Sequence, residues 1–505
     1  MLRSCSHLAE SARLAAIALL ALVISAPSVR AQAPEPAAPT EDATAAAPEP
    51  ATESAPPPGV NLPAKDPMEE NFAAYLHFAL IGQFEVADRY AQAFLALPEF
   101  AQSPMAPEAA QRVVALSESY KNSIDTLLLI IANTPISENA QKVLNLIREA
   151  HRLGRMAPDR ITENIKLLAG TPVQQAVALE RLRDSGEYAV PWLLEALGDA
   201  RQSNLHPFIV RTLPLLGKRA VNPLVEALSI DNPAVTGAVA DALGRIGYPQ
   251  ALPYLQRIVE NRSANPAVRE AAAAAIRAIV VSDPSVKELP AAELFRQLAE
   301  QYYENTESLR PDPSEPRANV WSLRDGILTP TEVPPEIYHW VMAMRTARAS
   351  LELQPNQPRV VALWLAANFN REHALGLDVA SEEPAETADL TKPADFPRSI
   401  YFARTFGPMY AQLALARAIR DKDPAVALGA IAALDVTAGP ATMVDPKAPE
   451  AASLAEALNF PDLLVRIRAA LALARSLPQA DFTGSDRVVP ILASAVSLTG
   501  KRNYL

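Results

Sequence analysis

The feature that most constrains this fold is a sequence repeat of 31 residues between Thr171 and Val281. The segment Ala189–Leu197 recurs as Ala220–Leu228 and again as Ala251–Val259, which places equivalent residues at 189, 220 and 251. In each copy the apolar residues follow the spacing of one helical face. One helical pair cannot bury such a face alone, whereas stacked copies can. The sequence therefore predicts an all-α fold built as an α-solenoid.

The ends of the first helix of each copy are marked by capping signals. A polar residue followed by proline precedes this helix at Thr171-Pro172, Asn232-Pro233 and Asn265-Pro266. The polar side chain accepts an otherwise unpaired N–H, and proline at the first helical position needs no partner. Glycine, which tolerates the left-handed conformation after a helix, stands at Gly186, Gly217 and Gly247. Each copy is therefore expected to be a helix, a tight turn and a second helix.

These copies resemble HEAT repeats, in the short form first described in phycobilisome-lyase-like proteins. The resemblance rests on Asn232–Val235 and Asn265–Val268, on the following Arg269–Ala272, and on the Ala-Val-Pro start of the second helix at Ala189. It covers residues 171–281 and implies HEAT-like helical hairpins. Because HEAT repeats serve adaptors, chaperones and lyases alike, the resemblance indicates a fold more than a function. With the export signal described next, it suggests a secreted bacterial HEAT-repeat protein.

The N-terminus reads as an export signal followed by a tether. Residues 1–31 combine flanking arginines with an apolar run at Leu14–Ile24, and small residues precede Gln32. Eleven apolar residues are too few to cross a bilayer, which needs about twenty. We therefore expect a cleaved signal and export to a bacterial periplasm or cell envelope, with a retained anchor as the alternative. Residues 32–67 contain ten prolines and predict a disordered linker.

The rest of the chain divides by pattern. We expect an N-terminal helical region resembling tetratricopeptide hairpins at residues 68–157, followed by the HEAT-repeat block at residues 158–308. A helical region with a β-hairpin is expected at residues 309–380, a linker at residues 381–397, and a second HEAT-like block at residues 398–505. The hairpin turn is expected at Asp325-Gly326, a pair typical of type I′ turns. A solenoid usually ends in a polar capping repeat. None is evident before Leu505, which favours either a truncated chain or an end capped by a partner.

Composition and motifs argue against several functional classes. The formal charge is −11, without a basic stripe, which argues against binding to nucleic acid or anionic membranes. The only cysteine, Cys5, lies in the signal, and the chain lacks phosphate-binding, dinucleotide-binding and hydrolase motifs. We therefore expect no catalytic residues, cofactor or metal. The pair Glu372-His373 is interpreted as an exposed helix end rather than as a catalytic pair.

One surface column of the repeats is the candidate binding site. Residues on the outer side of the second helices recur at equivalent positions: Trp192, Glu195, Pro223, Glu226, Tyr254 and Arg257. Second helices usually line the inner face of a HEAT solenoid, so these six residues could form the floor of a groove. The alternative is that Trp192 and Tyr254 pack between neighbouring repeats.

Three functions fit this pattern. The first is a non-catalytic scaffold of the cell envelope that binds a protein or peptide, without inserting into the membrane after signal cleavage. The second is a lyase-like or chaperone-type HEAT enzyme that acts on an exported protein. The third is a signalling adaptor that lacks a C-terminal receiver-like domain. The sequence does not define the oligomeric state.

Overall fold

The computed structural model describes residues 66–101, 105–122, 124, 138–283, 289–313, 315–393, 395–439, 453–478 and 481–497. The predicted signal at residues 1–31 lies outside these residues, as does the predicted linker up to residue 65. Among the described residues, no helix is both long and apolar enough to span a membrane.

The N-terminal helices have a hydrophobic core of their own. They are α2 (Pro67–Leu80), α3 (Phe84–Leu95), the short 3-10 helix η1 (Pro98–Phe100), α4 (Pro107–Ser119) and α6 (Glu138–Met156). Helix α2 pairs with α3, and α4 pairs with α6. Phe72 and Phe94 are fully buried in this core, with ring centroids 5.3 Å apart.

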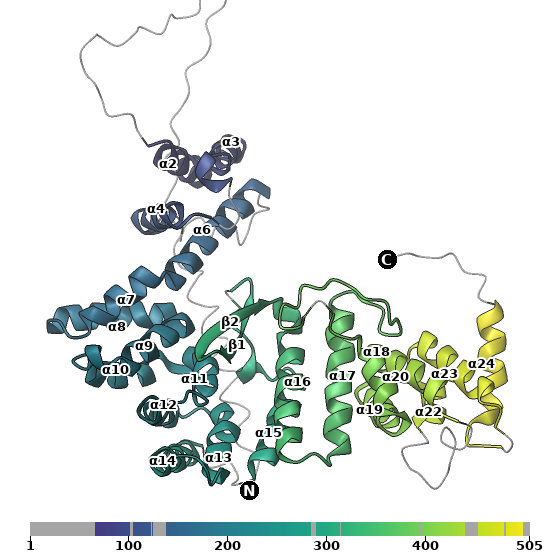
Figure 1. The fold of residues 1–505 in the computed structure, drawn as a ribbon. Helices are drawn as coiled ribbons and strands as arrows, with labels where there is room; N and C mark the ends of the chain where they lie inside the picture. The colour runs from purple at the N-terminus through teal and green to yellow at the C-terminus, as the bar shows by residue number, and fades with distance from the viewer. Residues whose placement is uncertain are drawn as a thin grey trace, which may run out of the picture. The chain divides into compact units, whose positions relative to one another are not determined.

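The repeat block follows as stacked helical hairpins (Figure 1). Its elements are α7 (Pro158–Leu167), α8 (Pro172–Ser185), η2 (Gly186–Tyr188), α9 (Ala189–Gly198), η3 (Ala200–Gln202), α10 (His206–Thr212), η4 (Leu213–Ala220), α11 (Val221–Ala227), α12 (Pro233–Ile246), η5 (Pro249–Ala251), α13 (Leu252–Glu260) and α14 (Pro266–Ser282). The helices α9, α11 and α13 are the second helices of successive copies. Most of the described chain is helical, and the prediction of an all-α solenoid is confirmed.

The N-capping residues predicted from the sequence cap their helices in the structure. Thr171 forms a capping box with Gln174, and the side chains of Asn232 and Asn265 accept from the first N–H groups of α12 and α14. Gly247 ends α12 with a left-handed φ of 74°. Local sequence therefore sets these boundaries, because each signal satisfies a backbone group that the helix leaves unpaired.

A helical region with one β-hairpin follows. It contains α15 (Ala291–Tyr303), η6 (Glu307–Leu309), β1 (Ala318–Arg324), β2 (Ile327–Val333), α16 (Pro335–Leu353) and α17 (Pro358–Ala374). The strands pair antiparallel, with Arg324 opposite Ile327. Both turn residues, Asp325 and Gly326, have positive φ, as a type I′ turn requires. The predicted hairpin is confirmed. It contacts α9, α11 and α16.

The C-terminal part again consists of helical pairs. It contains α18 (Ser399–Phe406), α19 (Pro408–Asp421), α20 (Pro424–Thr437), α22 (Ser453–Glu456), η8 (Ala457–Asn459), α23 (Leu463–Arg475) and α24 (Ser485–Ser497). Its buried residues belong to the same hydrophobic core as those of the repeat block. Asp423 caps α20 by accepting from Val426 N at 3.2 Å.

The prediction that Glu372 lies at an exposed helix end is wrong. Glu372 is only 1% exposed, and its carboxylate accepts from Arg398 Nε at 3.1 Å and from the backbone N and Oγ of Ser399, each at 2.7 Å. The preceding residue, Arg371, donates to Asp389 at 2.7 Å, and Asp389 is also buried. The described part of the loop at residues 381–397, predicted as a linker, is therefore anchored to the core by ionic contacts.

Gly244 lies at a close approach of two repeat helices, α12 and α14. A Cβ at this position of α12 would lie 2.6 Å from the Cα of Ala275 in α14. We expect Gly244→Ala to lower the free energy of unfolding by about 1–3 kcal/mol, because a backbone atom cannot yield without moving the helix. The change is measurable as a lower midpoint in urea denaturation.

Gly237 provides a matched control in the same helix. A Cβ there meets nothing within 4 Å. Gly237→Ala should therefore raise stability, by up to about 1 kcal/mol, because alanine has the higher helix propensity. Equal effects of the two substitutions would contradict the close packing of α12 on α14.

Candidate functional site

The structure places the six predicted binding residues in different surroundings. Trp192 is partly buried against the core and Glu195 is exposed, whereas Pro223 and Tyr254 are buried. The ring of Tyr254 meets Phe295 of α15 edge to face, with centroids 4.9 Å apart. The guanidinium of Arg257 lies 5.8 Å and 5.5 Å from the centroids of these two rings. Glu226 forms an ion pair with Arg345 of α16.

Later segments of the same chain thus cover much of the predicted groove floor. Helix α15 packs on α13, and the hairpin packs on α9 and α11. Tyr254 is only 6% exposed, so an external peptide does not reach it in this conformation. This corrects the expected role of Tyr254 as an open anchor and favours the packing alternative for that residue. A binding role for Trp192 and Glu195 remains a prediction.

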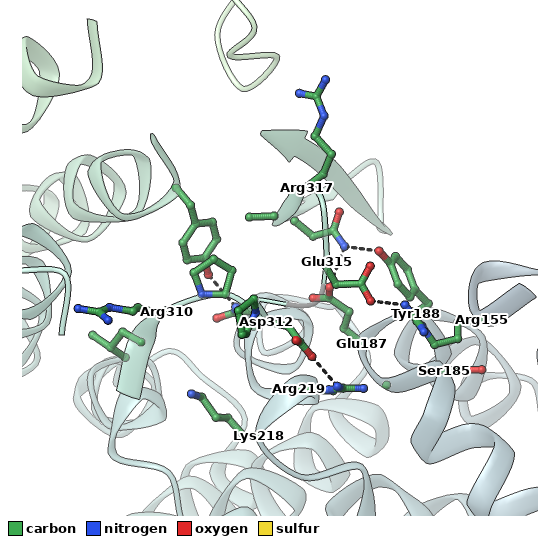
Figure 2. A pocket seen from close by; sticks show the side chains of 18 of the residues that line it. Arg155, Ser185, Glu187, Tyr188, Lys218, Arg219, Arg310, Asp312, Glu315 and Arg317 are labelled. Atoms are coloured by element: carbon green, nitrogen blue, oxygen red, sulfur yellow. Dashed lines mark hydrogen bonds and ion pairs between the residues drawn. The ribbon is translucent and has the colours of Figure 1, made fainter. Parts of the chain in front are cut away.

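A cavity of about 530 Å³ lies at the turns that precede the second helices. We call it the turn cavity. It is lined by residues of η2, η4, η5 and η6, by residues just before β1, and by Arg155 and Tyr338 (Figure 2). Its volume falls in the range typical of ligand sites, roughly 300–1,000 Å³. Three lining residues occupy one position of the 31-residue repeat, namely Tyr188, Arg219 and Gln250.

The deep part of the turn cavity is a neutral hydrogen-bond network. Gln250 Nε2 donates to Asn222 Oδ1 at 2.6 Å, and Asn222 Nδ2 donates to the hydroxyl oxygen of Tyr338 at 2.9 Å. Gln250 Nε2 also donates to the hydroxyl oxygen of Tyr302 at 2.7 Å. Burial raises the pKa of Tyr338 well above its usual range, so its hydroxyl stays protonated. These groups offer hydrogen bonds without charge.

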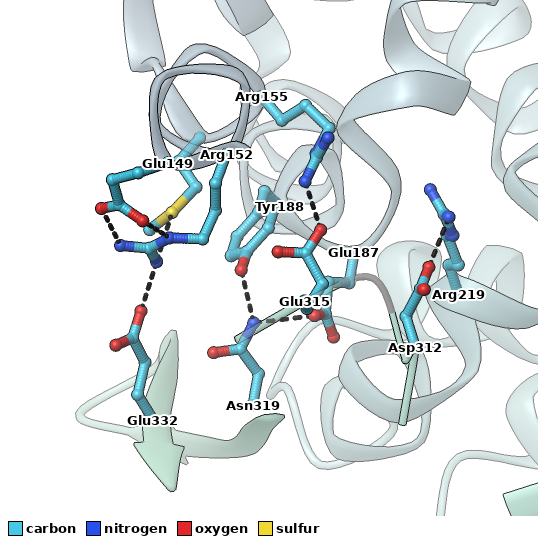
Figure 3. A network of polar contacts seen from close by, with 11 residues as sticks. Glu149, Arg152, Arg155, Glu187, Tyr188, Arg219, Asp312, Glu315, Asn319 and Glu332 are labelled. Atoms are coloured by element: carbon cyan, nitrogen blue, oxygen red, sulfur yellow. Dashed lines mark hydrogen bonds and ion pairs between the residues drawn. The ribbon is translucent and has the colours of Figure 1, made fainter. Parts of the chain in front are cut away.

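Glu187 ties the first turn of the repeat block to the hairpin. Its carboxylate accepts from Asn319 Nδ2 at 2.7 Å and from Trp321 Nε1 at 2.6 Å. Asn319 also donates to the hydroxyl oxygen of Tyr188 at 2.7 Å (Figure 3). Burial raises the pKa of Glu187 to about 7, although both hydrogen bonds oppose the shift. Glu187 therefore changes charge near neutral pH while holding β1 in place.

The raised pKa of Glu187 predicts a loss of stability as pH increases. The ordinary pKa is 4.5 and the folded value is about 7. Between these values the folded chain retains a proton that the unfolded chain has released, so stability falls as pH rises through this window. The full loss is about 3 kcal/mol, at roughly 1.4 kcal/mol per unit.

Urea denaturation of the wild-type chain and of Glu187→Gln at pH 5 and pH 8 measures this effect. Because glutamine does not titrate, the free energy of unfolding of the wild type should fall relative to that of the variant between pH 5 and pH 8. Parallel pH profiles would show that the Glu187 carboxyl does not titrate in this range.

Cationic side chains at the turn cavity fall into two groups. Arg155 pairs with Glu315, and Arg219 pairs with Asp312. Lys218, Arg310 and Arg317 have no carboxylate partner among the residues that the structure describes. Lys218 Nζ lies 5.5 Å from the ring centroid of Tyr248, and Arg310 Nε donates to the backbone oxygen of Asn305 at 3.0 Å.

The three cations without a carboxylate partner among the described residues do not all lie on the same side of the cavity. Figure 2 shows Lys218 and Arg310 on one side of the Arg219–Asp312 pair, while Arg317 points away from them. Two further carboxylates line the cavity, Asp184, which pairs with Arg160 at 3.1 Å, and Glu307. The lining is therefore a mixture of charges, which suits a ligand with few, defined carboxylates better than a uniform polyanion.

The cavity was not among the sequence predictions, although the sequence holds a signal for part of it. Glu187 and Lys218 each follow a turn glycine, 31 residues apart. Polar residues at this repeated turn position point to a shared surface. The contribution of Asp312 and Glu315 had no such signal, because they lie outside the repeat. Among the described residues, no cluster of three or more His, Cys, Asp or Glu side chains could hold a metal ion.

Comparison with known proteins supports the repeat character. Residues 190–277 match the family model of HEAT repeats. The matched range contains Lys218, Arg219, Asn222 and Gln250 of the turn cavity, but neither Glu187 nor the segment before β1. No curated protein sequence matches the chain. The middle of the chain thus has HEAT-repeat character, and HEAT repeats generally form protein-binding scaffolds.

Proposed function

We propose that the chain is a non-catalytic scaffold of the cell envelope that binds a protein or peptide partner at the turn cavity. The observation that carries this proposal is a cavity of about 530 Å³ that combines neutral hydrogen-bonding groups with two cations, Lys218 and Arg310, which have no carboxylate partner among the described residues. A carboxylate can pair with the cations while backbone amides of the same peptide hydrogen-bond to Asn222 and Gln250. The partner proposed is therefore an acidic peptide segment.

Charge placement supports a protein partner over nucleic acid. The whole chain carries a formal charge of −11, which repels a polyanion at long range. Locally, both cations and carboxylates line the cavity. Such a lining selects ligands by the position of each charge, because a misplaced carboxylate meets Glu307 or Asp184. Complementary placement of this kind gives specificity more than raw affinity.

Binding of labelled acidic peptides tests the proposal. We would screen peptides of about ten residues with two carboxylates at varied spacing, each beside an amide counterpart, by fluorescence anisotropy. The double variant Lys218→Glu with Arg310→Glu should bind the best peptide at least about tenfold more weakly, since hydrogen bonds to charged groups contribute about 1.5–3 kcal/mol.

A second double variant controls for net charge. Lys166 and Arg211 are exposed, lie outside the turn cavity and have no ion-pair partner among the described residues. Reversing both charges changes the formal charge by the same amount. Equal weakening by the two double variants would show that the turn cavity is not the binding site.

The cell-envelope location is part of the proposal and rests on the signal-like residues 1–31. N-terminal sequencing of the protein from fractionated cells should find a mature chain that begins near Gln32. An intact Met1 on that protein would contradict export with cleavage. The lyase-like, chaperone-type and signalling functions stay predictions, since no observation on the described residues favours them.

A further inference from the structure

A second cavity, of about 420 Å³, lies in the C-terminal part of the chain, where α20 packs on α18 and α23 (Figure 1). We call it the helix groove. Much of its lining consists of apolar side chains from α20 and α23, namely Leu428, Ile431, Ala432, Val436, Leu464 and Leu471. Val436 is 64% exposed and Leu464 is 48% exposed, so the helix groove is open to solvent.

The equivalent helix face is polar in the main repeat block. Helices α12 and α20 both begin with Pro-Ala-Val, which aligns them. Ala432 of α20 then corresponds to Asp241 of α12, and Val436 corresponds to Arg245. In α12 this aspartate and arginine form an ion pair at 3.6 Å, with side chains 54% and 50% exposed. In α23, aligned on its first valine, Leu471 takes the position of the aspartate. A face that is solvated in α12 is thus apolar in α20 and α23, and neighbouring exposed apolar residues mark surfaces at which proteins bind partners.

One cation at the helix groove has no partner. Arg404 pairs with Glu382, and Arg475 pairs with Asp435 at 2.6 Å. Arg468 of α23 also lines the groove and is exposed, and it has no hydrogen-bond or ion-pair partner among the described residues. Arg468 therefore offers a fork of N–H donors for a carboxylate beside the apolar lining.

Asp378 adds a charge of the opposite sign to the helix groove. It belongs to the segment that follows α17, whereas Arg468 belongs to α23. Its Oδ1 accepts from Ala380 N at 3.0 Å, and its carboxylate has no cationic partner among the described residues. A ligand carboxylate is attracted by Arg468 and repelled by Asp378. The two charges therefore favour a ligand that carries its carboxylates along one edge only.

The arrangement of the apolar residues favours a helix as the occupant. Leu428, Ala432 and Val436 are spaced by four residues and form one ridge along α20. Such a ridge packs against another helix whose apolar residues recur at every third or fourth position. The same molecule contains a contact of this kind, because α15 packs on α13 and the ring of Phe295 meets that of Tyr254 at 4.9 Å. A helix is thus the element that already covers a repeat helix in this chain.

We propose that the helix groove binds an amphipathic helix of a partner protein, with the apolar stripe of that helix on α20 and α23 and a carboxylate at Arg468. Burial of the stripe supplies the attraction, and the pairing with Arg468 selects charge and orientation. Amphipathic helices bind to grooves of this kind in other proteins. The helix groove and the turn cavity share no lining residue, so this site does not depend on the acidic peptide proposed for the turn cavity.

Fluorescence anisotropy with three labelled peptides tests the proposal. The first has about 18 residues, long enough to form a helix, with a leucine stripe, glutamates along one edge of the stripe and glutamines elsewhere. The second has lysine in place of glutamate, and the third has the composition of the first with its leucines dispersed around the helix. At a salt concentration of about 0.15 M, which screens the net charge of the chain, the first peptide should bind at least about tenfold more tightly than the others. Burial of one leucine side chain is sufficient for that factor.

Paired variants locate the binding. Val436→Gln with Leu464→Gln removes two exposed apolar side chains from the helix groove and should weaken binding of the first peptide at least about tenfold. The control, Val173→Gln with Val281→Gln, removes apolar side chains of residues that are 74% and 81% exposed elsewhere, and it should bind like the wild type. Arg468→Glu should reverse the preference, so that the lysine peptide binds more tightly than the glutamate peptide. All five residues are exposed, and circular dichroism checks that each variant is folded.

The outcomes separate the helix groove from the turn cavity. Binding of the first peptide that both groove variants weaken and the control leaves unchanged supports the proposal. No binding to the wild type, or binding that either groove variant leaves unchanged, overturns it. Loss of binding only in the variant Lys218→Glu with Arg310→Glu would place the peptide in the turn cavity, which overturns the helix groove and supports the proposed function.

Two other occupants are tested with the same variants. Phosphatidylglycerol vesicles report binding to an anionic lipid surface, and sedimentation velocity at increasing protein concentration reports binding of a second copy of the chain. Vesicle binding or dimerisation that Val436→Gln with Leu464→Gln abolishes would assign the helix groove to that occupant and overturn the partner helix. Neither effect is expected.

Discussion

Glu372→Ala should lower the free energy of unfolding by about 3–5 kcal/mol, the range seen when one partner of a buried ion pair is removed. The carboxylate of Glu372 is 1% exposed and accepts from Arg398 and Ser399. Without it, the guanidinium of Arg398 keeps only the backbone oxygens of Glu383 and Asp378. A charge would then remain buried without a counter-ion. Urea denaturation followed by circular dichroism measures the loss.

An exposed pair on a nearby helix is the matched control. Glu352 pairs with Arg348 at 2.8 Å, and their side chains are 57% and 78% exposed. Glu352→Ala should change the free energy of unfolding by less than about 1 kcal/mol, because water solvates both charges. A loss at Glu372 no larger than that at Glu352 would mean that Glu372 is not buried as described.

Tyr254→Ala should cost about 3–5 kcal/mol of stability, which is typical for removal of a large buried aromatic side chain. Its ring packs edge to face on Phe295 and lies under the guanidinium of Arg257. The substitution leaves a cavity between α13 and α15 that these rigid helices cannot close. A lower thermal denaturation midpoint reports the effect.

Trp192→Ala separates packing from binding at the predicted groove. Trp192 is only partly buried, so its loss should lower stability by less than the loss of Tyr254. If the open-groove hypothesis holds at this end of the column, Trp192→Ala weakens partner binding while the protein stays folded. A Tyr254→Ala protein with unchanged stability would contradict the packing of α15 on the second helices.

Local sequence determines the repeat and its boundaries. Thr171, Asn232 and Asn265 begin helices because their side chains accept N–H groups only a few residues away. The Asp325-Gly326 turn forms because both residues tolerate positive φ. These effects act within one or two helical turns, so the pattern of residue types is sufficient to predict them.

The environment of Glu372 could not be predicted in this way. Its partners Arg398 and Ser399 lie 26 and 27 residues further along the chain, beyond a loop whose described residues form no helix or strand. An isolated Glu-His pair is most often exposed, and only the return of the chain onto α17 buries it. Burial of this kind depends on the path of the loop, which has no periodic signal.

The candidate site also combines features that the sequence predicts with features that only the tertiary structure shows. The sequence by itself determined that the chain stacks 31-residue helical hairpins and that a turn follows Gly186, Gly217 and Gly247, because these features depend on helix periodicity and backbone conformation. Only the tertiary structure decided that α15 covers Tyr254 and that Asp312 and Glu315 meet Arg219 and Arg155. Those pairs join residues 93 and 160 positions apart. Contacts at such separation are set by how the elements pack, and no local pattern encodes them.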